Sequence, residues 1–90
     1  VTPLRALAAA ASRLASDAER KEAYHRVLTS FDTLLASRRA TSEQCASVLN
    51  ALHEAVAERM QPEAGPAERS ALVQLRQANE KLPPGFQLIL

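Results

Sequence analysis

Large apolar side chains recur every three or four residues between positions 17 and 37. This spacing matches the turn of an α-helix and places them on one stripe, about 120° wide. The stripe consists of Tyr24, Val27, Leu28, Phe31, Leu34 and Leu35. Ser16 and Glu19 form a capping-box pattern, which predicts that this helix begins at Asp17. A long amphipathic helix must bury such a stripe, so the sequence predicts a packed helical domain.

Three further helices are predicted from the same periodicity. They span about residues 3–15, 42–60 and 66–82. Thr41 and Gln44 form a second capping-box pattern, and Pro83-Pro84 ends the last helix because proline lacks the N–H donor. The proline-rich segment 61–66 is the clearest loop. No Gly or Pro separates the first two helices, so one kinked helix is the alternative; the cap at Ser16 favours two.

The predicted fold is all-α, a small four-helix bundle over residues 1–85, or a three-helix bundle if the first two helices are continuous. Its 90 residues make one domain. Two Gly, five Pro and no alternating β-branched runs argue against sheet. The expected core contains Leu28, Phe31, Leu35, Leu49, Leu52, Leu72 and Leu75, and the first helix is expected to face it through Leu7, among others.

A short apolar tail, residues 86–90, follows the Pro-Pro-Gly break. It contains Phe86, Leu88, Ile89 and Leu90. Exposed together, these side chains would form an aggregation or docking hazard. We expect the tail to fold back and close one end of the core. The alternatives are that it leads into a following domain or docks elsewhere as a linear motif.

The catalytic and metal-binding motifs considered are all incomplete. His53 begins an H-E-x-x-H zinc motif, but Ala57 occupies the position of the second histidine. Glu22 and His25 supply one Glu-x-x-His motif, whereas a di-iron bundle needs two. Cys45, the only cysteine, falls on an apolar stripe and is expected to be a core residue. We therefore expect no enzymatic activity, no cofactor and no metal.

Charge and hydropathy narrow the choice of partners. The net charge is +1 and the basic residues are scattered, so nucleic acid is not the expected partner. No apolar run approaches the roughly 20 residues that span a bilayer, so no membrane partner is expected. A lone cysteine fits an intracellular compartment, cytoplasmic or nuclear. The oligomeric state is not indicated by the sequence.

Residues 24–60 hold a helix, a short polar link and a second helix. The pattern consists of Leu34-Leu35, Thr41-Ser42, Val48-Leu49 and Leu52. It resembles part of the helical domain shared by a vesicle coat protein and the steroid receptor RNA activator. The resemblance covers less than half of the chain, and no function is carried over from it.

The expected function is a non-catalytic protein–protein interaction module, namely an adaptor, scaffold or assembly domain. The chain starts without Met, so we expect it to be part of a larger protein. The alternatives are a nucleic-acid-binding helical domain and an accessory or regulatory subunit of an enzyme. The candidate partner-binding residues are Val73 and Arg76, beside a groove on the fourth helix, and Phe86, Leu88, Ile89 and Leu90.

Thr41 is a candidate phosphorylation site. Arg38-Arg39-Ala40-Thr41 matches the R-R-x-S/T pattern that basophilic kinases recognise. A phosphate there would lie at a helix N-terminus, where free N–H groups and the helix dipole favour anions. The modification is therefore expected to preserve the fold.

Overall fold

The computed structural model describes residues 2–60 and 65–89, with side chains from Leu4 onward. Its elements are α1 (Thr2–Ala11), α2 (Asp17–Ser37), α3 (Ser42–Arg59), α4 (Pro66–Asn79) and the short 3-10 helix η1 (Pro84–Phe86). No strand occurs in these two ranges. The all-α fold and the four separate helices are confirmed. Most of the predicted 61–66 loop, residues 61–64, lies outside the described residues.

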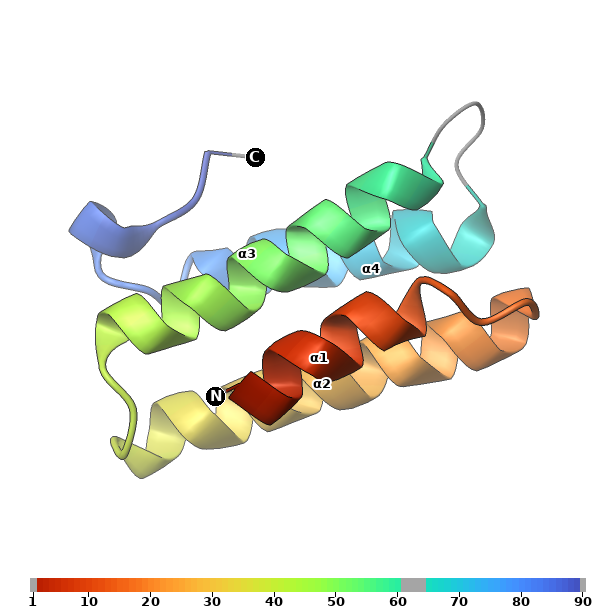
Figure 1. Ribbon diagram of the computed structural model, residues 1–90. Coiled ribbons are helices and arrows are strands. Elements are labelled where there is room, and N and C mark those ends of the chain that lie inside the picture. The colour runs from red at the N-terminus through yellow and green to blue at the C-terminus, as the bar shows by residue number, and fades with distance from the viewer. Residues whose placement is uncertain (1, 61–64, 90) are drawn as a thin grey trace.

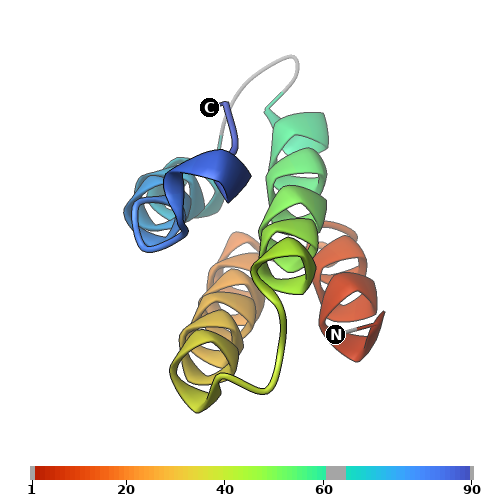
Figure 2. The same cartoon turned by 90° about the vertical axis from the view of Figure 1, so that its left-hand side faces the viewer.

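Successive helices run in opposite directions, as Figure 1 shows. Helices α2 and α3 form the centre of the bundle and each contacts both α1 and α4. Helices α1 and α4 lie on opposite sides and share no contact within the described part of the chain (Figure 2). The tail therefore returns to the bundle on the side away from α1.

The predicted caps are present at both central helices. The Ser16 hydroxyl accepts a hydrogen bond from the Glu19 N–H at 3.4 Å. Thr41 and Gln44 form both bonds of a capping box, at 3.1 Å and 2.9 Å. Between the two helices, Arg38 adopts a left-handed conformation with φ 57°, the only positive φ of a non-glycine residue in the described ranges.

Helix α1 is shorter than predicted. It ends at Ala11 instead of residue 15, and two tight turns follow it, Arg13 N–H to Ala10 and Leu14 N–H to Ala11. The chain has to leave the helix because Ser16 adopts the extended conformation of an N-cap. Helix α4 likewise ends at Asn79 instead of Leu82, through tight turns at its last residues.

Most of the predicted core is confirmed. Leu28, Phe31, Leu49, Leu52 and Leu75 are buried, and Leu35 packs partly buried against them. Two predictions are wrong. Leu72 is only partly buried and lies outside the core cluster. Leu7 is 51% exposed, because α1 approaches α2 and α3 through the small side chains of Ala8 and Ala11.

Candidate interaction surface

The C-terminal tail is fastened to the end of α4 by the side chain of Asn79. The amide nitrogen Nδ2 donates a hydrogen bond to the Leu88 carbonyl oxygen at 2.9 Å, and Oδ1 accepts one from the Leu88 N–H at 2.7 Å. A third bond joins Gln87 Nε2 to the carbonyl oxygen of Leu82 at 3.0 Å. We call the paired bonds between Asn79 and Leu88 the Asn79 clamp. It holds the tail back against the bundle (Figures 1 and 2).

A short turn that begins at Pro83 and Pro84 allows the tail to reach Asn79. Pro84 to Phe86 form η1, and the Phe86 N–H bonds to the Pro83 carbonyl at 2.9 Å. This turn reverses the chain, and Gln87 then adopts an extended conformation. Successive side chains of an extended segment point to opposite sides. Leu88 accordingly packs partly buried against the core, whereas Ile89 is fully exposed.

The tail thus leaves two large apolar side chains in solvent. Phe86 is 43% exposed and Ile89 is 100% exposed. The tail folds back as expected, but neither Phe86 nor Ile89 belongs to the core, because the turn and the clamp direct only Leu88 inward. Leu90 lies outside the described residues. Of the candidate binding residues on the tail, Phe86 and Ile89 are exposed to solvent, and we call them the outward side of the tail.

Val73 and Arg76, the residues of the predicted groove, do not line the hollows of about 120, 180 and 270 Å³ between the helices, and the groove stays a prediction. Both residues are exposed on α4, Val73 at 55%. The hollow beside α4, of about 120 Å³, lies between α2 and α4 and is lined by residues such as Gln77 instead. Asp32 and Lys81 form an ion pair of 2.9 Å at this hollow. Val73 and Arg76 face solvent because the inward face of α4 is formed by Ala71, Leu75 and Ala78.

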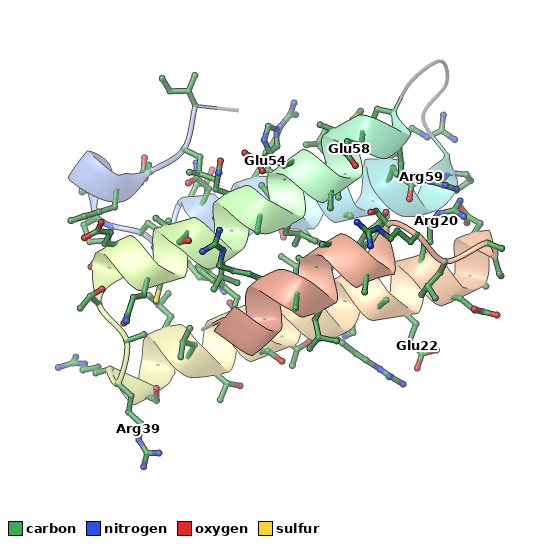
Figure 3. The ribbon with its side chains drawn as sticks, viewed as in Figure 1. Arg20, Glu22, Arg39, Glu54, Glu58 and Arg59 are labelled. Atoms are coloured by element: carbon green, nitrogen blue, oxygen red, sulfur yellow. The ribbon has the colours of Figure 1, made fainter. Side chains whose placement is uncertain are left out.

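A larger hollow of about 270 Å³ lies between α1 and α3, on the side away from the tail. Arg5 lines it from α1 and Arg13 from the turn that follows α1, and Glu54 and Glu58, labelled in Figure 3, line it from α3. None of these four forms an ion pair with another described residue. Ala9, Ala51 and Ala55 also line the hollow, and their small side chains leave this space between the two helices unfilled. It has charge of both signs. Its buried polar side chain, Ser12, already donates a hydrogen bond to the Ala9 carbonyl oxygen and offers no free group to a ligand.

A buried polar cluster joins the start of α2 to the start of α4. Arg20 Nε lies 3.0 Å from Glu68 Oε2, and both side chains are buried. Further guanidinium N–H groups of Arg20 bond to the carbonyls of Leu14 and Ala15 at 3.0 Å and 2.9 Å. Asp17 accepts from the Ala67 N–H at 3.1 Å. The charges are compensated inside the protein, so this cluster is a structural joint.

Two titratable side chains, Cys45 and Tyr24, are buried in the core. Burial raises the pKa of the Cys45 thiol, which is 1% exposed, and this disfavours the thiolate needed for nucleophilic attack. Burial, with the nearby Glu68 carboxylate, raises the pKa of Tyr24 well above its ordinary value. The Tyr24 hydroxyl has no hydrogen-bond partner among residues 2–60 and 65–89. The core assignment of Cys45 is confirmed.

The Thr41 side chain has a structural role. It is exposed, and its hydroxyl oxygen accepts the Gln44 N–H at 3.1 Å. Ester formation at this oxygen would place a phosphate beside the first N–H groups of α3. Phosphorylation of Thr41 remains a prediction.

No group of three or more His, Cys, Asp or Glu side chains in the described ranges could hold a metal ion. No helix there is long and apolar enough to cross a membrane. No protein-family model matches the chain, and no curated protein or solved structure is significantly similar to it. The resemblance of residues 24–60 to the coat-protein domain therefore gains no support from these comparisons.

Proposed function

We propose that this chain is a non-catalytic protein–protein interaction module that binds its partner through Phe86 and Ile89. The observation that supports this most is the exposure of Ile89 on a segment whose backbone is fixed at the preceding residue. A segment that is already ordered loses little conformational entropy on binding, so burial of its apolar side chains favours association directly.

The size of the effect is sufficient for a binding anchor. Burying one large aliphatic side chain contributes roughly 1.5–3 kcal/mol, which corresponds to about a tenfold to hundredfold change in Kd. Aromatic anchors such as Phe86 are enriched at interfaces. A partner with an apolar pocket beside a polar rim would complement this outward side of the tail. An adaptor, scaffold or assembly role, and an intracellular location, belong to the same proposal.

A quantitative binding comparison tests this proposal. The full chain is used to isolate partners by affinity purification, and the recovered protein is purified and titrated against Ile89→Asp and Phe86→Asp. Leu7→Asp is the matched control because Leu7 is an exposed apolar residue on α1, which has no contact with α4 or η1. We expect both tail variants to weaken binding about tenfold or more, with Leu7→Asp unchanged.

The opposite result would locate the interface elsewhere. If all three variants bind equally, Phe86 and Ile89 do not form the interface. Thermal melting by circular dichroism verifies that each variant is folded. A nucleic-acid-binding helical domain and an enzyme subunit role stay the alternatives to this proposal.

A further inference from the structure

Helix α1 presents an almost wholly apolar side to solvent. Within positions 4–11 the exposed residues are Arg5, Ala6, Leu7, Ala9 and Ala10. A surface helix normally carries polar residues on its solvent side, and a helix that is apolar all round is normally covered. Helices α2 and α3 cover only the inner side of α1, and α4 makes no contact with it. The outer side of α1 therefore has no partner in the part of the chain that the structure describes.

The hollow between α1 and α3 separates charges of opposite sign. Its α1 wall, which includes the turn after that helix, carries Arg5 and Arg13. Its α3 wall carries Glu54 and Glu58. All four side chains are exposed, and none forms an ion pair with another described residue. Glu54 accepts a hydrogen bond of 3.2 Å from the amide of Asn50, which is neutral and leaves the carboxylate charge uncompensated.

This arrangement is complementary to itself. A two-fold axis through the middle of the hollow, perpendicular to its open side, places α1 of one copy over α3 of the other. Each arginine wall then faces a glutamate wall, which is what the isologous interface of a symmetric dimer requires. Ala9, Ala51 and Ala55 line the hollow between the charges. Side chains this small allow helices of the two copies to approach closely, since the distance between packed helices depends on the residues at the contact.

We infer that the hollow between α1 and α3, with the apolar outer side of α1, is one half of a two-fold dimer interface, and that its occupant is the same surface of a second copy of this chain. Arg5 and Arg13 of each copy pair with Glu54 and Glu58 of the other around an alanine-rich centre. The surface lies on the side away from the tail, so the inference does not depend on partner binding by Phe86 and Ile89.

A small zwitterionic molecule fits the same charges less well. The four charged groups are exposed and hydrated, so single ion pairs with a small ligand contribute little. A second copy also covers the apolar outer side of α1, which a small molecule leaves in water. Because α1 has only ten residues, the interface is small, and we expect a dimer that dissociates on dilution.

Sedimentation velocity of the full chain tests for this dimer. The concentration is varied from about 10 µM to about 1 mM, the range in which small interfaces associate, and the average mass should rise toward that of two chains. An acidic variant carries Arg5→Glu with Arg13→Glu, and a basic variant carries Glu54→Arg with Glu58→Arg. Each should weaken association about tenfold or more, because like charges then face each other across the two-fold axis.

A mixture of the two variants distinguishes the two-fold pairing from every other role of these charges. One copy then presents four acidic side chains and the other presents four basic ones at the same positions. The equimolar mixture should therefore associate at least as strongly as the native chain. Neither ion pairs within one chain nor docking of another protein predicts this recovery.

A control pair separates the effect of position from that of net charge. It consists of Arg38→Glu with Arg39→Glu, and of Glu43→Arg with Glu80→Arg. All four positions are exposed and none lines the hollow, whereas the net charge changes by the same amount as in the test variants. At about 0.15 M salt, where exposed charges are screened beyond about 8 Å, both control variants should dimerise like the native chain.

Circular dichroism verifies that each variant is folded. If a charge reversal prevents folding, glutamine at the same two positions replaces it and should still weaken association. A mixture of the two glutamine variants retains one arginine wall opposite one glutamate wall, so it should associate more strongly than either variant alone.

Three results would overturn the inference. The first is a native chain that stays monomeric up to about 1 mM, which would leave this surface to another protein. The second is a dimer that neither charge-reversed variant weakens. The third is a mixture of the two variants that associates no better than each does alone. Binding at Phe86 and Ile89 is measured with a different protein, so the two proposals fail separately.

Discussion

Arg20 of α2 and Glu68 of α4 form a buried ion pair, with 3.0 Å between Nε and Oε2, although 48 positions separate them in the sequence. The side chain of Glu68 is 1% exposed and that of Arg20 is 8% exposed. The same guanidinium bonds to the two carbonyls that precede α2. One side chain thus connects the end of the α1 segment, the start of α2 and the start of α4.

Removing one partner of this pair should destabilise the domain strongly. We expect Glu68→Gln to lower the free energy of unfolding by about 3 kcal/mol, because the buried Arg20 then keeps only the partly exposed Asp17 carboxylate, at 3.4 Å. Urea denaturation measures the change. Glu22→Gln is the control, since the Glu22–Arg26 pair is exposed and such pairs contribute only about 0.5 kcal/mol or less. A similar loss in both variants would contradict the structural role of the buried pair.

Gly65 is required by the same cluster. A Cβ at this position would lie 2.7 Å from Glu68 Oε1, whereas a Cβ at Gly85 would meet nothing within 4 Å. Gly65 has φ −79° and ψ 166°, which alanine also adopts, so the cost is steric. We expect Gly65→Ala to destabilise by about 1–3 kcal/mol and Gly85→Ala to be neutral or slightly stabilising. Thermal melting distinguishes the two, and equal melting temperatures would exclude a steric role.

Tyr24 should make the domain less stable at high pH. Its pKa is raised in the folded state above the unfolded value of about 10, so the folded chain keeps a proton that the unfolded chain loses. The stabilisation is complete below about pH 10 and is lost as pH rises toward the folded-state pKa, by up to about 1.4 kcal/mol per pH unit. Tyr24→Phe should remove this contribution and leave that of the Cys45 thiol, whose raised pKa acts in the same direction.

The phenolate absorbance offers a direct readout, because Tyr24 is the only tyrosine and the chain has no tryptophan. In the folded chain it should develop well above the pH at which it develops in denaturant. Coinciding titrations in the two states would show that Tyr24 is accessible to solvent.

Arg38 occupies a backbone conformation that favours glycine. Its φ of 57° places it in the left-handed region at the C-terminus of α2. Non-glycine residues adopt this region at a cost of roughly 1–2 kcal/mol. We expect Arg38→Gly to leave the fold intact and to stabilise it by up to about 1 kcal/mol. Arg39→Gly, at the next residue, which has no positive φ, is the control and should not stabilise.

The two phenylalanines should respond differently to truncation. Phe31 is 0% exposed at the centre of the core, so Phe31→Ala should cost about 3–5 kcal/mol. Phe86 is 43% exposed, so Phe86→Ala should change stability by only about 0.5 kcal/mol. Melting curves followed by circular dichroism compare them. An unchanged melting temperature for Phe31→Ala would mean that the α2 stripe does not form the core.

Local chemistry allowed much of the fold to be predicted. The 3.6-residue stripe identified the buried side of α2, and hydroxyl caps identified where α2 and α3 begin, because both depend only on residues within one or two turns. Prediction was wrong at Leu7 and Leu72, where rotation of a helix by a fraction of a turn selects between neighbouring apolar residues. Only packing against the other helices sets that rotation.

The candidate site was accessible to sequence reasoning only in part. The apolar tail after the proline break was recognised, but Asn79 was not, because an asparagine at the end of a helix has no local sign of a partner nine residues ahead. Arg20 and Glu68 were equally hidden, since charged residues on helices are usually solvated. Local sequence determined the helices and the break before the tail. Tertiary structure decided which polar groups became buried, because burial is tolerated only where packing brings a distant donor and acceptor together.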